Sequence, residues 1–498
     1  MRADREYAAG VRTGRRLTVV CAAVAALWAP APAGAEQRLT TIETPSRNVD
    51  PSRVRFNGTE PGGRLQARVL LPDGYDGRRH FPVLFLLHGV GDNFSDWSKA
   101  AKGDIANTAR GLDAIVVMPE AGRGFYTNWW NEGRRGDPGW ERFYLDELVP
   151  QVERELRVSP GRSNHAIAGL SMGGFGAAWL ATQLPGYFGS VAAFSGFVQH
   201  QRPEVEAGLR AVGEVEYTDI FGPMDAFYAT GHNPTRLVGN LTRSRLYVTV
   251  GDGTADPGVQ SEPSAVVAGG IVEGGLRPQS DELVAAARAA GVPTTYRPLS
   301  GVHDWPYWRR HLRDAIDWGL FEAVPEAPDA WRYQTMAQTG DAWGLRYAFA
   351  APPAEVVTLE RAGDRLRGRG SGTVTLRNAA GCGFTAPLPF ERGMPPAICG
   401  RISVRVAPRR VRLGRTTRVR FRVSRVVSGR RVAVRGARVR LGRRTATTNR
   451  RGRAVLRYRP RGRPGVRRAR VGIRGLRSVR PAVRVIRPLG ENGAGWGS

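Results

Sequence analysis

The sequence predicts an α/β sandwich built on a mostly parallel sheet, followed by a small β module and a basic β-sandwich. Short apolar runs alternate with helical stretches between residues 64 and 324, the alternation stops at Pro325–Pro328, and from Arg401 apolar residues occupy every second position. Alternating strands and helices are typical of a parallel sheet covered on both faces, whereas period-two alternation is typical of an antiparallel sandwich. The chain of 498 residues is long enough for roughly two to four domains.

The predicted parallel sheet lies in residues 36–325. Runs such as Val83–Leu87 are apolar throughout, as expected for strands that are buried on both faces. The expected strands are 65–71, 83–87, 114–118, 165–168, 190–194, 245–250 and 294–298, and the expected helices are 140–156, 172–183, 281–290 and 304–321. Residues 198–239 show weak periodicity, and we expect them to cap the sheet.

Beyond this region, residues 326–400 lose the helical pattern and contain short β-like runs between glycine-rich turns, which predicts the small β module. Residues 401–488 are the predicted basic sandwich, with arginine in many of the places between its alternating apolar residues. Residues 489–498 are expected to be a loose tail.

Residues 1–35 are predicted to be an export signal peptide. Arg12, Arg15 and Arg16 precede an apolar run from Leu17 to Trp28, and Ala33-Gly34-Ala35 follows as a small-x-small cleavage site. The run is too short to span a bilayer, so we expect no transmembrane anchor after cleavage and a secreted or envelope location. An uncleaved anchor is the alternative.

The net charge of +30 is concentrated near the C-terminus. Residues 401–498 contain 32 Arg, no Lys and one acidic residue, Glu491, so the first 400 residues are close to neutral. The protein is therefore a neutral body with a basic C-terminal domain. The net charge therefore does not indicate that the whole chain binds nucleic acid, because the positive charge belongs to the C-terminal domain alone.

Two cysteines remain after cleavage of the signal, Cys382 and Cys399. In an exported protein, two cysteines favour a disulfide over free thiols. The sequence contains no cluster with metal-ligand spacing and no nucleotide-binding glycine motif, so we expect neither a metal nor a cofactor.

The strongest chemical signal is the segment Gly169-Leu170-Ser171-Met172-Gly173-Gly174. It follows a short apolar strand and begins an alanine-rich helical run, which is the context of a nucleophile elbow. The flanking glycines permit the tight turn that lifts the serine oxygen out of the sheet. Ser171 is therefore the predicted nucleophile, and the alternative is an ordinary glycine turn.

A serine hydroxyl needs a base, and the chain has seven histidines. His303 lies between a late strand and the last long helix, where this architecture places the base. His311 lies inside that helix, and His88 comes too early in the chain. We therefore predict that His303 is the base.

The acid that orients the histidine is expected on the loop after the strand at 245–250. That loop offers Asp252 and Asp256. Asp256 is favoured because it is far enough from the strand to reach across to His303, whereas Asp252 is placed to shape the turn. Asp252 is kept as the alternative acid.

Acyl transfer also needs donors for the tetrahedral oxyanion. One is expected to be the backbone N–H of Met172, next to the nucleophile. The other is expected in His88-Gly89-Val90-Gly91, after the strand at 83–87, where we favour the N–H of Val90 over Gly89 or Gly91.

These segments together resemble the secreted putative-esterase family, which includes mycolyltransferases, feruloyl-esterase domains and S-formylglutathione hydrolase. The resemblance extends from about residue 64 to residue 321. It is carried by the segments 86–90, 116–119, 125–130, 140–148, 169–174, 251–254 and 301–308. It implies an α/β-hydrolase fold with Ser171, His303, an acid after Gly251, and amides at Val90 and Met172.

Two departures from the mycolyltransferases favour the general esterase branch. Their acid is a glutamate at about the position of Pro257 here, and the aspartate and arginine around their oxyanion loop are His88 and Gly91. The aromatic residues Trp129, Trp130 and Trp305 are candidates for lining an acyl groove, with core packing as the alternative.

The basic tail is similar to the Ig-like sandwich modules of exported bacterial enzymes. Its arginine face would attract anionic cell-envelope polymers by counterion release. Few aromatic residues are available there to stack on bases, so we expect no nucleic-acid partner. Biased composition alone is the alternative explanation.

The sequence thus predicts an exported serine esterase that hydrolyses carboxylic esters through an acyl-enzyme. The first alternative is a cell-envelope acyltransferase of the mycolyltransferase type, which would use the same residues with a different acceptor. The second is a catalytically inactive wall-binding protein.

Overall fold

The computed structural model describes residues 38–51, 54, 65–131, 139–213, 215–379, 381–395, 402–427, 430–473 and 476–487. The predicted signal peptide, the C-terminal tail and Cys399 lie outside these residues. Cys382, inside them, is in a disulfide bond. No helix within the described ranges is both long and apolar enough to cross a membrane.

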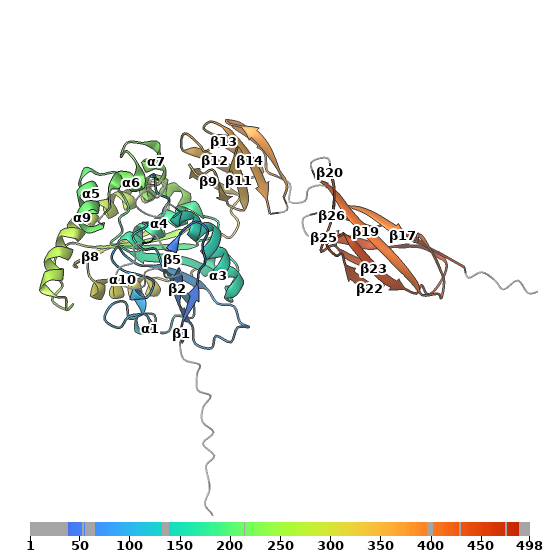
Figure 1. Ribbon diagram of the computed structural model, residues 1–498, viewed down its shortest axis with the longest axis horizontal. Coiled ribbons are helices and arrows are strands. Elements are labelled where there is room, and N and C mark those ends of the chain that lie inside the picture. Colours follow the sequence, from blue (N-terminus) through green and yellow to red (C-terminus); the bar gives the residue numbers. More distant parts are fainter. Residues whose placement is uncertain are drawn as a thin grey trace, which may run out of the picture.

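The first part of the molecule is built on an eight-stranded sheet with the order β1-β2-β4-β3-β5-β6-β7-β8 (Figure 1). Strands β3 to β8 pair in parallel, whereas β1 and β2 are antiparallel to their neighbours. The strands are β1 Arg38–Glu43, β2 Gln66–Leu71, β3 Val83–Leu87, β4 Ile115–Pro119, β5 His165–Leu170, β6 Ser190–Phe194, β7 Arg245–Gly251 and β8 Thr294–Leu299. The predicted α/β class with a mostly parallel sheet is confirmed.

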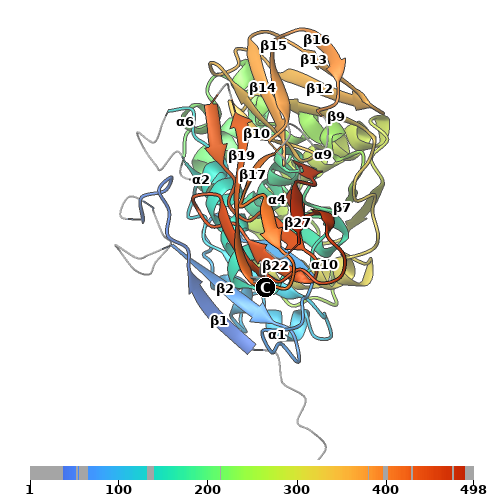
Figure 2. The same ribbon diagram turned by 90° about the vertical axis from the view of Figure 1, so that its right-hand side faces the viewer.

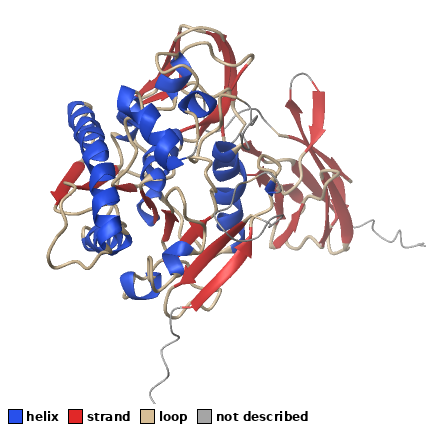
Figure 3. Ribbon diagram, turned by 60° about the vertical axis from the view of Figure 1, so that its left-hand side comes forward, coloured by secondary structure: helices blue, strands red, loops and turns tan. Residues whose placement is uncertain are grey.

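Helices cover both faces of this sheet (Figure 3). One apolar core lies under α1 and α10 and includes Leu312, and the other lies under α3, α4 and α9 and includes Phe175. The helices are α1 Ile105–Thr108, α2 Trp140–Arg142, α3 Val149–Glu155, α4 Met172–Gln183, α5 Pro203–Gly208, α6 Tyr217–Phe221, α7 Phe227–Gly231, α8 Pro234–Leu237, α9 Pro263–Ala289 and α10 Trp305–Asp317. Because all strands from β3 to β7 are buried on both faces, the strand ends are the natural place for a site.

Two helices differ from the expectation. The helix expected at 140–156 is interrupted by a π-helical segment, Phe143–Leu148. The helix expected at 281–290 is the last third of α9, which begins 18 residues earlier, at Pro263. Its first part contains four glycines and Pro278, residues that disfavour a helix in isolation. Tertiary packing overrides that preference, since Leu276, Leu283 and Val284 of α9 are buried in the core.

The small β module consists of two four-stranded antiparallel sheets, with orders β10-β11-β14-β15 and β16-β13-β12-β9. Its own core includes Trp331, Leu359 and Leu376. The strands are β9 Ala330–Thr335, β10 Thr339–Ala342, β11 Leu345–Phe349, β12 Val357–Ala362, β13 Arg365–Arg369, β14 Thr373–Asn378, β15 Gly383–Pro387 and β16 Phe390–Gly393.

Hydrogen bonds attach this module to the α/β part. The Tyr333 hydroxyl donates to the Gln183 carbonyl at 3.1 Å, and the Asn240 side chain exchanges two bonds with the Gln334 backbone. The Arg162 guanidinium lies 4.5 Å from the centre of the Trp343 ring, and the Glu326 carboxylate accepts from the backbone N–H groups of Arg162 and Ser163. The module and the α/β part therefore share a polar and specific interface.

The C-terminal region is a separate β body, which is set apart from the rest in Figure 1 and faces the viewer in Figure 2. Along β19, Val419, Phe421 and Val423 are buried, while the arginines between them are exposed. The strands are β17 Ser403–Ala407, β18 Arg410–Arg412, β19 Thr417–Val427, β20 Arg430–Ala433, β21 Arg438–Leu441, β22 Arg444–Thr447, β23 Arg453–Tyr458, β24 Gly465–Arg468, β25 Arg470–Ile473, β26 Leu476–Val479 and β27 Ala482–Ile486. The basic β-sandwich therefore keeps its aliphatic face inside and its guanidinium groups in solvent.

Candidate active site

Ser171 occupies a sharp turn between β5 and α4. Its backbone has φ 55° and ψ −118°, an unusual conformation for a residue with a side chain. Its N–H donates to the Phe194 carbonyl at 2.9 Å, and its carbonyl accepts from Phe175 at 3.1 Å. The side chain is half-buried. The predicted strand–turn–helix context of the serine is therefore present.

Close backbone contacts explain the glycines around Ser171. A Cβ on Gly169 would lie 2.3 Å from the Gly173 carbonyl oxygen, and one on Gly173 would lie 2.5 Å from that of Leu87. Backbone atoms cannot move away as side chains can, so these positions accept only glycine. The elbow is thus held tightly against the end of β3.

His303 follows β8 and immediately precedes α10, whose N-cap is Asp304. Its Nδ1 lies 2.7 Å from Oε1 of Glu273, and its side chain is 12% exposed. The His303 N–H donates to the Gly269 carbonyl at 3.2 Å, and a Cβ on Gly269 would lie 2.8 Å from that nitrogen. Helix α9 therefore contacts both the backbone and the ring of His303.

Glu273 is fully buried on α9. Its second oxygen, Oε2, accepts from the Gly251 N–H at 2.7 Å, so both oxygens have partners. Burial raises the pKa of Glu273, but the hydrogen bond and charge of His303 lower it by more, and the net pKa lies below the ordinary value. The carboxylate is consequently ionised at neutral pH and suited to holding an imidazole in one orientation.

A ladder of backbone contacts connects the serine with this pair. Ser171 bonds to the end of β6 through Phe194, and Ser195 donates to the Thr249 carbonyl on β7 at 2.8 Å. Gly251, at the end of β7, then donates to Glu273. Serine, histidine and glutamate are thus all positioned at the carboxyl edge of the same parallel sheet.

The predicted acid has to be corrected, because the structure does not bring Asp256 to His303. The Asp256 carboxylate pairs with Arg310 at 2.8 Å and accepts from the Gly258 N–H. Asp252, the alternative, caps its own turn by accepting from the backbone and hydroxyl of Thr254. Both aspartates have local partners, whereas Glu273 faces the imidazole.

Sequence reasoning missed Glu273 because it placed the acid on the loop next to β7. The residue lies 22 positions after Gly251, in the part of α9 that had no predicted helix. A usable signal was present. Glu273 is the single carboxylate between Glu262 and Asp281, in a run of small and apolar residues. An acidic residue in such surroundings is rarely buried without a partner.

The loop after β3 lies beside the elbow, as the prediction requires. A Cβ on Gly89 would lie 3.4 Å from the Ser171 Cβ, and Val90 is half-buried. Met172 is the first residue of α4, so its N–H belongs to the first helical turn, which has no intrahelical acceptor. The loop that contains Val90 and the helical turn that begins at Met172 therefore both lie next to Ser171, and the role of their amides as oxyanion donors stays a prediction.

A buried network supports this loop from behind. His88 is 1% exposed, and its Nδ1 lies 2.8 Å from the Gly89 carbonyl oxygen. The Tyr126 hydroxyl donates to the His88 carbonyl at 2.8 Å, and Nε2 of His88 lies 3.4 Å from the Glu120 carboxylate. Although burial lowers the pKa of His88, Glu120 raises it by more. His88, excluded as the base, thus helps to hold the oxyanion loop.

The three predicted groove tryptophans have different surroundings. Trp129 is buried and donates to the Gly124 carbonyl, and Trp305 packs edge-to-face on Trp97 and Trp308. Both are core residues. Trp130 is 45% exposed and lines a cavity that does not include Ser171 or His303. Among the described residues, no group of three or more histidine, cysteine or acidic side chains is arranged to hold a metal ion.

A serine on a strained elbow, with a histidine and a buried glutamate at the carboxyl edge of a mostly parallel sheet, defines an α/β-hydrolase. Residues 58–318 match the model of the family described as Putative esterase, and the chain belongs to this family. The family predicted from the sequence is confirmed.

Named relatives are similar to the same part of the chain. The esterase Rv1288 of Mycobacterium tuberculosis is 31% identical over 220 residues, which cover 41% of this chain and 47% of that protein. The diacylglycerol acyltransferase/mycolyltransferase Ag85A of Mycobacterium leprae is 28% identical over 48% of this chain and 74% of its own length. The chain thus spans about half the length of the esterase relative.

Among solved structures, that of Mycobacterium tuberculosis MPT51 aligns with a TM-score of 0.44 and 23% identity. The alignment covers 58% of this chain and 99% of the MPT51 chain.

Proposed function

We propose that this protein is a serine esterase that hydrolyses carboxylic esters through an acyl-enzyme intermediate. The observation that carries the proposal is the 2.7 Å contact between His303 Nδ1 and the buried Glu273, at the sheet edge where Ser171 occupies its elbow. Glu273 fixes the imidazole through Nδ1, which leaves Nε2 to accept the proton of the Ser171 hydroxyl.

In the proposed reaction, the Ser171 oxygen attacks the ester carbonyl while His303 takes its proton. The negative charge that develops on the carbonyl oxygen is stabilised by the N–H groups of Val90 and Met172. The alcohol then leaves with the proton from His303, and Ser171 carries the acyl group. Water, activated by the same histidine, releases the acid and restores the serine.

Acyl transfer to another alcohol, as in a cell-envelope acyltransferase, is the second candidate. It is supported by the similarity to the acyltransferase Ag85A. Both reactions use the same residues and differ in the acceptor that reaches the acyl-serine. A catalytically inactive wall-binding protein is less well supported, because the described residues supply a nucleophile, a base, an acid and two amides.

The proposal includes export and a contact with the cell envelope. Export is supported by the N-terminal segment with its arginines, apolar run and small-residue cleavage site. Contact with anionic polymers is supported by the sandwich, in which Arg418, Arg420 and Arg422 are exposed on one strand. Residues 402–487 contain no aspartate or glutamate to neutralise this charge.

The direct test is hydrolysis of a nitrophenyl ester by the wild type and by Ser171→Ala. We expect the variant to lose about 10⁴-fold or more in kcat, since the nucleophile is removed. Ser264→Ala is the matched control, because Ser264 is exposed at the start of α9. A fluorophosphonate should label Ser171 in the wild type. Labelling of a different serine, or full activity of Ser171→Ala, would contradict the proposal.

A further inference from the structure

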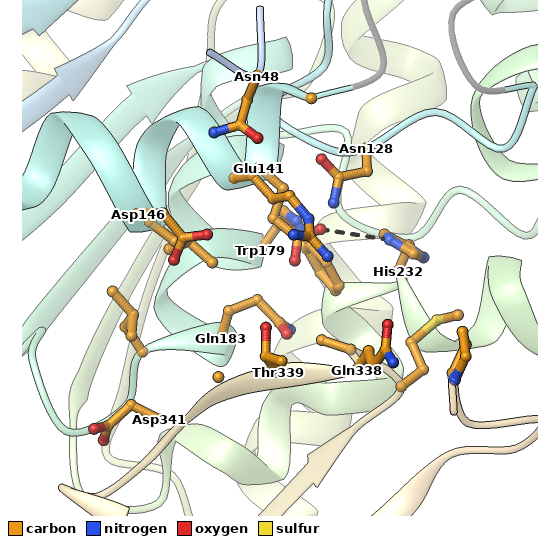
Figure 4. A pocket seen from close by; sticks show the side chains of 18 of the residues that line it. Asn48, Asn128, Glu141, Asp146, Trp179, Gln183, His232, Gln338, Thr339 and Asp341 are labelled. Carbon is orange, nitrogen blue, oxygen red and sulfur yellow. Dashed lines mark ion pairs between the residues drawn. The ribbon is translucent and has the colours of Figure 1, made fainter. Parts of the chain in front are cut away.

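A cavity of 1270 Å³ lies between the α/β part and the small β module (Figure 4). One wall comes from α2, α4 and the start of α7, and the other from residues 336–341 and β11 of the module. The nearest part of the elbow helix is Trp179, eight residues after Ser171, which is about 12 Å along the helix axis. This cavity is therefore separate from the site proposed above.

Three residues that line this cavity each have a buried side-chain polar atom without a hydrogen-bond partner. These atoms are Oε2 of Glu141, Nε1 of Trp179 and Oδ1 of Asn128. The Glu141 side chain is 8% exposed, and its Oε2 lies 3.5 Å from Nε2 of His232, a long ion pair. A buried polar atom that makes no hydrogen bond is unfavourable. A ligand that brings both hydroxyl donors and oxygen acceptors would satisfy all three.

Aromatic side chains stand at the same cavity. Trp130 is 45% exposed and packs against Tyr228 with ring centroids 5.0 Å apart, and Phe227 is 37% exposed. A single exposed aromatic residue needs no explanation, but a group of them beside a polar cavity is typical of a ligand-binding surface. The flat face of Trp130, next to polar groups, suits a ligand with one apolar C–H face and a polar rim.

The charges of the lining exclude other ligand classes. Among the described residues, three arginines and three carboxylates line the cavity, so these residues provide no surplus charge to select an anion such as a phosphate or a nucleotide. Burial raises the pKa of Asp146 and of Asp341, which reduces any attraction for a cation. Amide and hydroxyl side chains complete the lining with Asn48, Gln183, Gln338 and Thr339 (Figure 4). A ligand that is complementary to this lining is uncharged and rich in hydroxyl groups.

We infer that the cavity between the α/β part and the β module is a binding site for a neutral saccharide. Trp130 stacks on a sugar ring, Glu141 and Asn128 accept from its hydroxyl groups, and Trp179 donates to one of its oxygens. The inference does not depend on the esterase reaction, because none of these residues belongs to the proposed catalytic set.

The test is titration of the full chain with xylo-, cello-, arabino- and chito-oligosaccharides of four to six units, followed by tryptophan fluorescence and calorimetry. At concentrations up to about 10 mM, well above a millimolar Kd, at least one series should saturate. Trp130→Ala should weaken binding about tenfold or more, and Glu141→Gln, which keeps the shape, should also weaken it. Leu39→Ala removes a side chain of similar exposure far from the cavity lining and should bind as the wild type.

Two further readouts separate this site from the esterase. Nitrophenyl acetate hydrolysis should stay within about twofold of the wild type in Trp130→Ala, and saccharide binding should persist in Ser171→Ala. Thermal melting shows whether Glu141→Gln still folds. Absence of binding by every series, equal binding by wild type and Trp130→Ala, or stronger binding of a sugar phosphate than of its neutral sugar would each overturn the inference.

Discussion

The carboxyl edge of the parallel sheet and the arginine-rich sandwich use charge in opposite ways. At the sheet edge the Glu273 carboxylate is fully buried and bonded through both oxygens. In the sandwich, arginines such as Arg418 and Arg420 are exposed, and residues 402–487 offer no acidic partner. A buried charge acts on one neighbour at short range, whereas exposed charges act together through solvent and are screened by salt.

The largest expected effect on activity comes from removing the buried charge of Glu273. Glu273→Gln should reduce kcat by about 10³–10⁴-fold, because the neutral amide no longer stabilises the charged imidazole. Asp256→Asn and Asp252→Asn are the matched controls and should keep their activity to within about twofold, since neither carboxylate contacts His303. Steady-state kinetics on a nitrophenyl ester measures all three. A large loss in Asp256→Asn with little loss in Glu273→Gln would restore the acid predicted from the sequence.

The exposed charges should respond to salt. Binding of the full chain to an immobilised teichoic-type polymer should weaken by about 10²–10³-fold between 50 and 200 mM salt, because each phosphate contact releases a counterion. Ester hydrolysis should change much less over the same range. A neutral dextran surface is the control. Polymer binding that ignores salt would contradict an electrostatic role for the sandwich.

A smaller effect is expected where α9 meets His303. Gly269→Ala would place a Cβ 2.8 Å from the His303 nitrogen, and the loop would have to shift. Displacement of a catalytic group by a fraction of an ångström reduces kcat by about 10–100-fold. Gly274→Ala is on the same helix with open space around it, so activity should persist and the free energy of unfolding should rise by about 0.5–1 kcal/mol. Equal kinetics for the two variants would show that the α9 contact does not position His303.

The smallest effect concerns buried histidines and pH. Burial lowers the pKa of His311 to about 4 and that of His200 to about 3. At a pH between the ordinary histidine pKa of about 6.5 and these lowered pKa values, the unfolded chain binds protons that the folded chain does not. The free energy of unfolding therefore falls as the pH decreases through this range. Urea unfolding of His311→Leu at pH 7 and pH 5 should show a weaker pH dependence, by up to about 1.4 kcal/mol per pH unit. His80→Leu, at an exposed position, should leave the dependence unchanged.

The sequence was sufficient for the elbow and the base because their signals are local. Ser171 lies between glycines at a strand–helix junction, and His303 lies between the last strand and the last long helix. Both follow from short-range patterns of glycine and apolar residues. The fold class follows in the same way from the alternation of buried strands and helices.

The acid could not be found by the same reasoning. Glu273 lies 30 residues before His303, the residue that it contacts. Its helix segment contains Gly269, Gly270, Gly274 and Gly275, and helix propensities predict irregular structure for such a glycine-rich segment. Two of these glycines serve close packing instead, because Gly269 touches His303 and Gly270 touches Gly253. This glycine-rich composition is typical of a loop, but in the structure the segment is a helix that packs closely against the backbone of neighbouring loops.

The buried Arg162 has a consequence for the smallest piece of this chain that can fold by itself. Its guanidinium bonds reach Phe188 inside the hydrolase and Pro325 at its boundary, and Glu326 accepts from the Arg162 and Ser163 N–H groups. A chain that ended before Pro325 would leave the buried Arg162 without some of its partners, which would lower the free energy of unfolding by about 3–5 kcal/mol. The smallest α/β piece should therefore extend at least to Glu326, and the Tyr333–Gln183 and Asn240–Gln334 bonds connect it further to the β module. No hydrogen bond between described residues joins the arginine-rich sandwich to either of them, so we expect both to stay folded when the sandwich is removed.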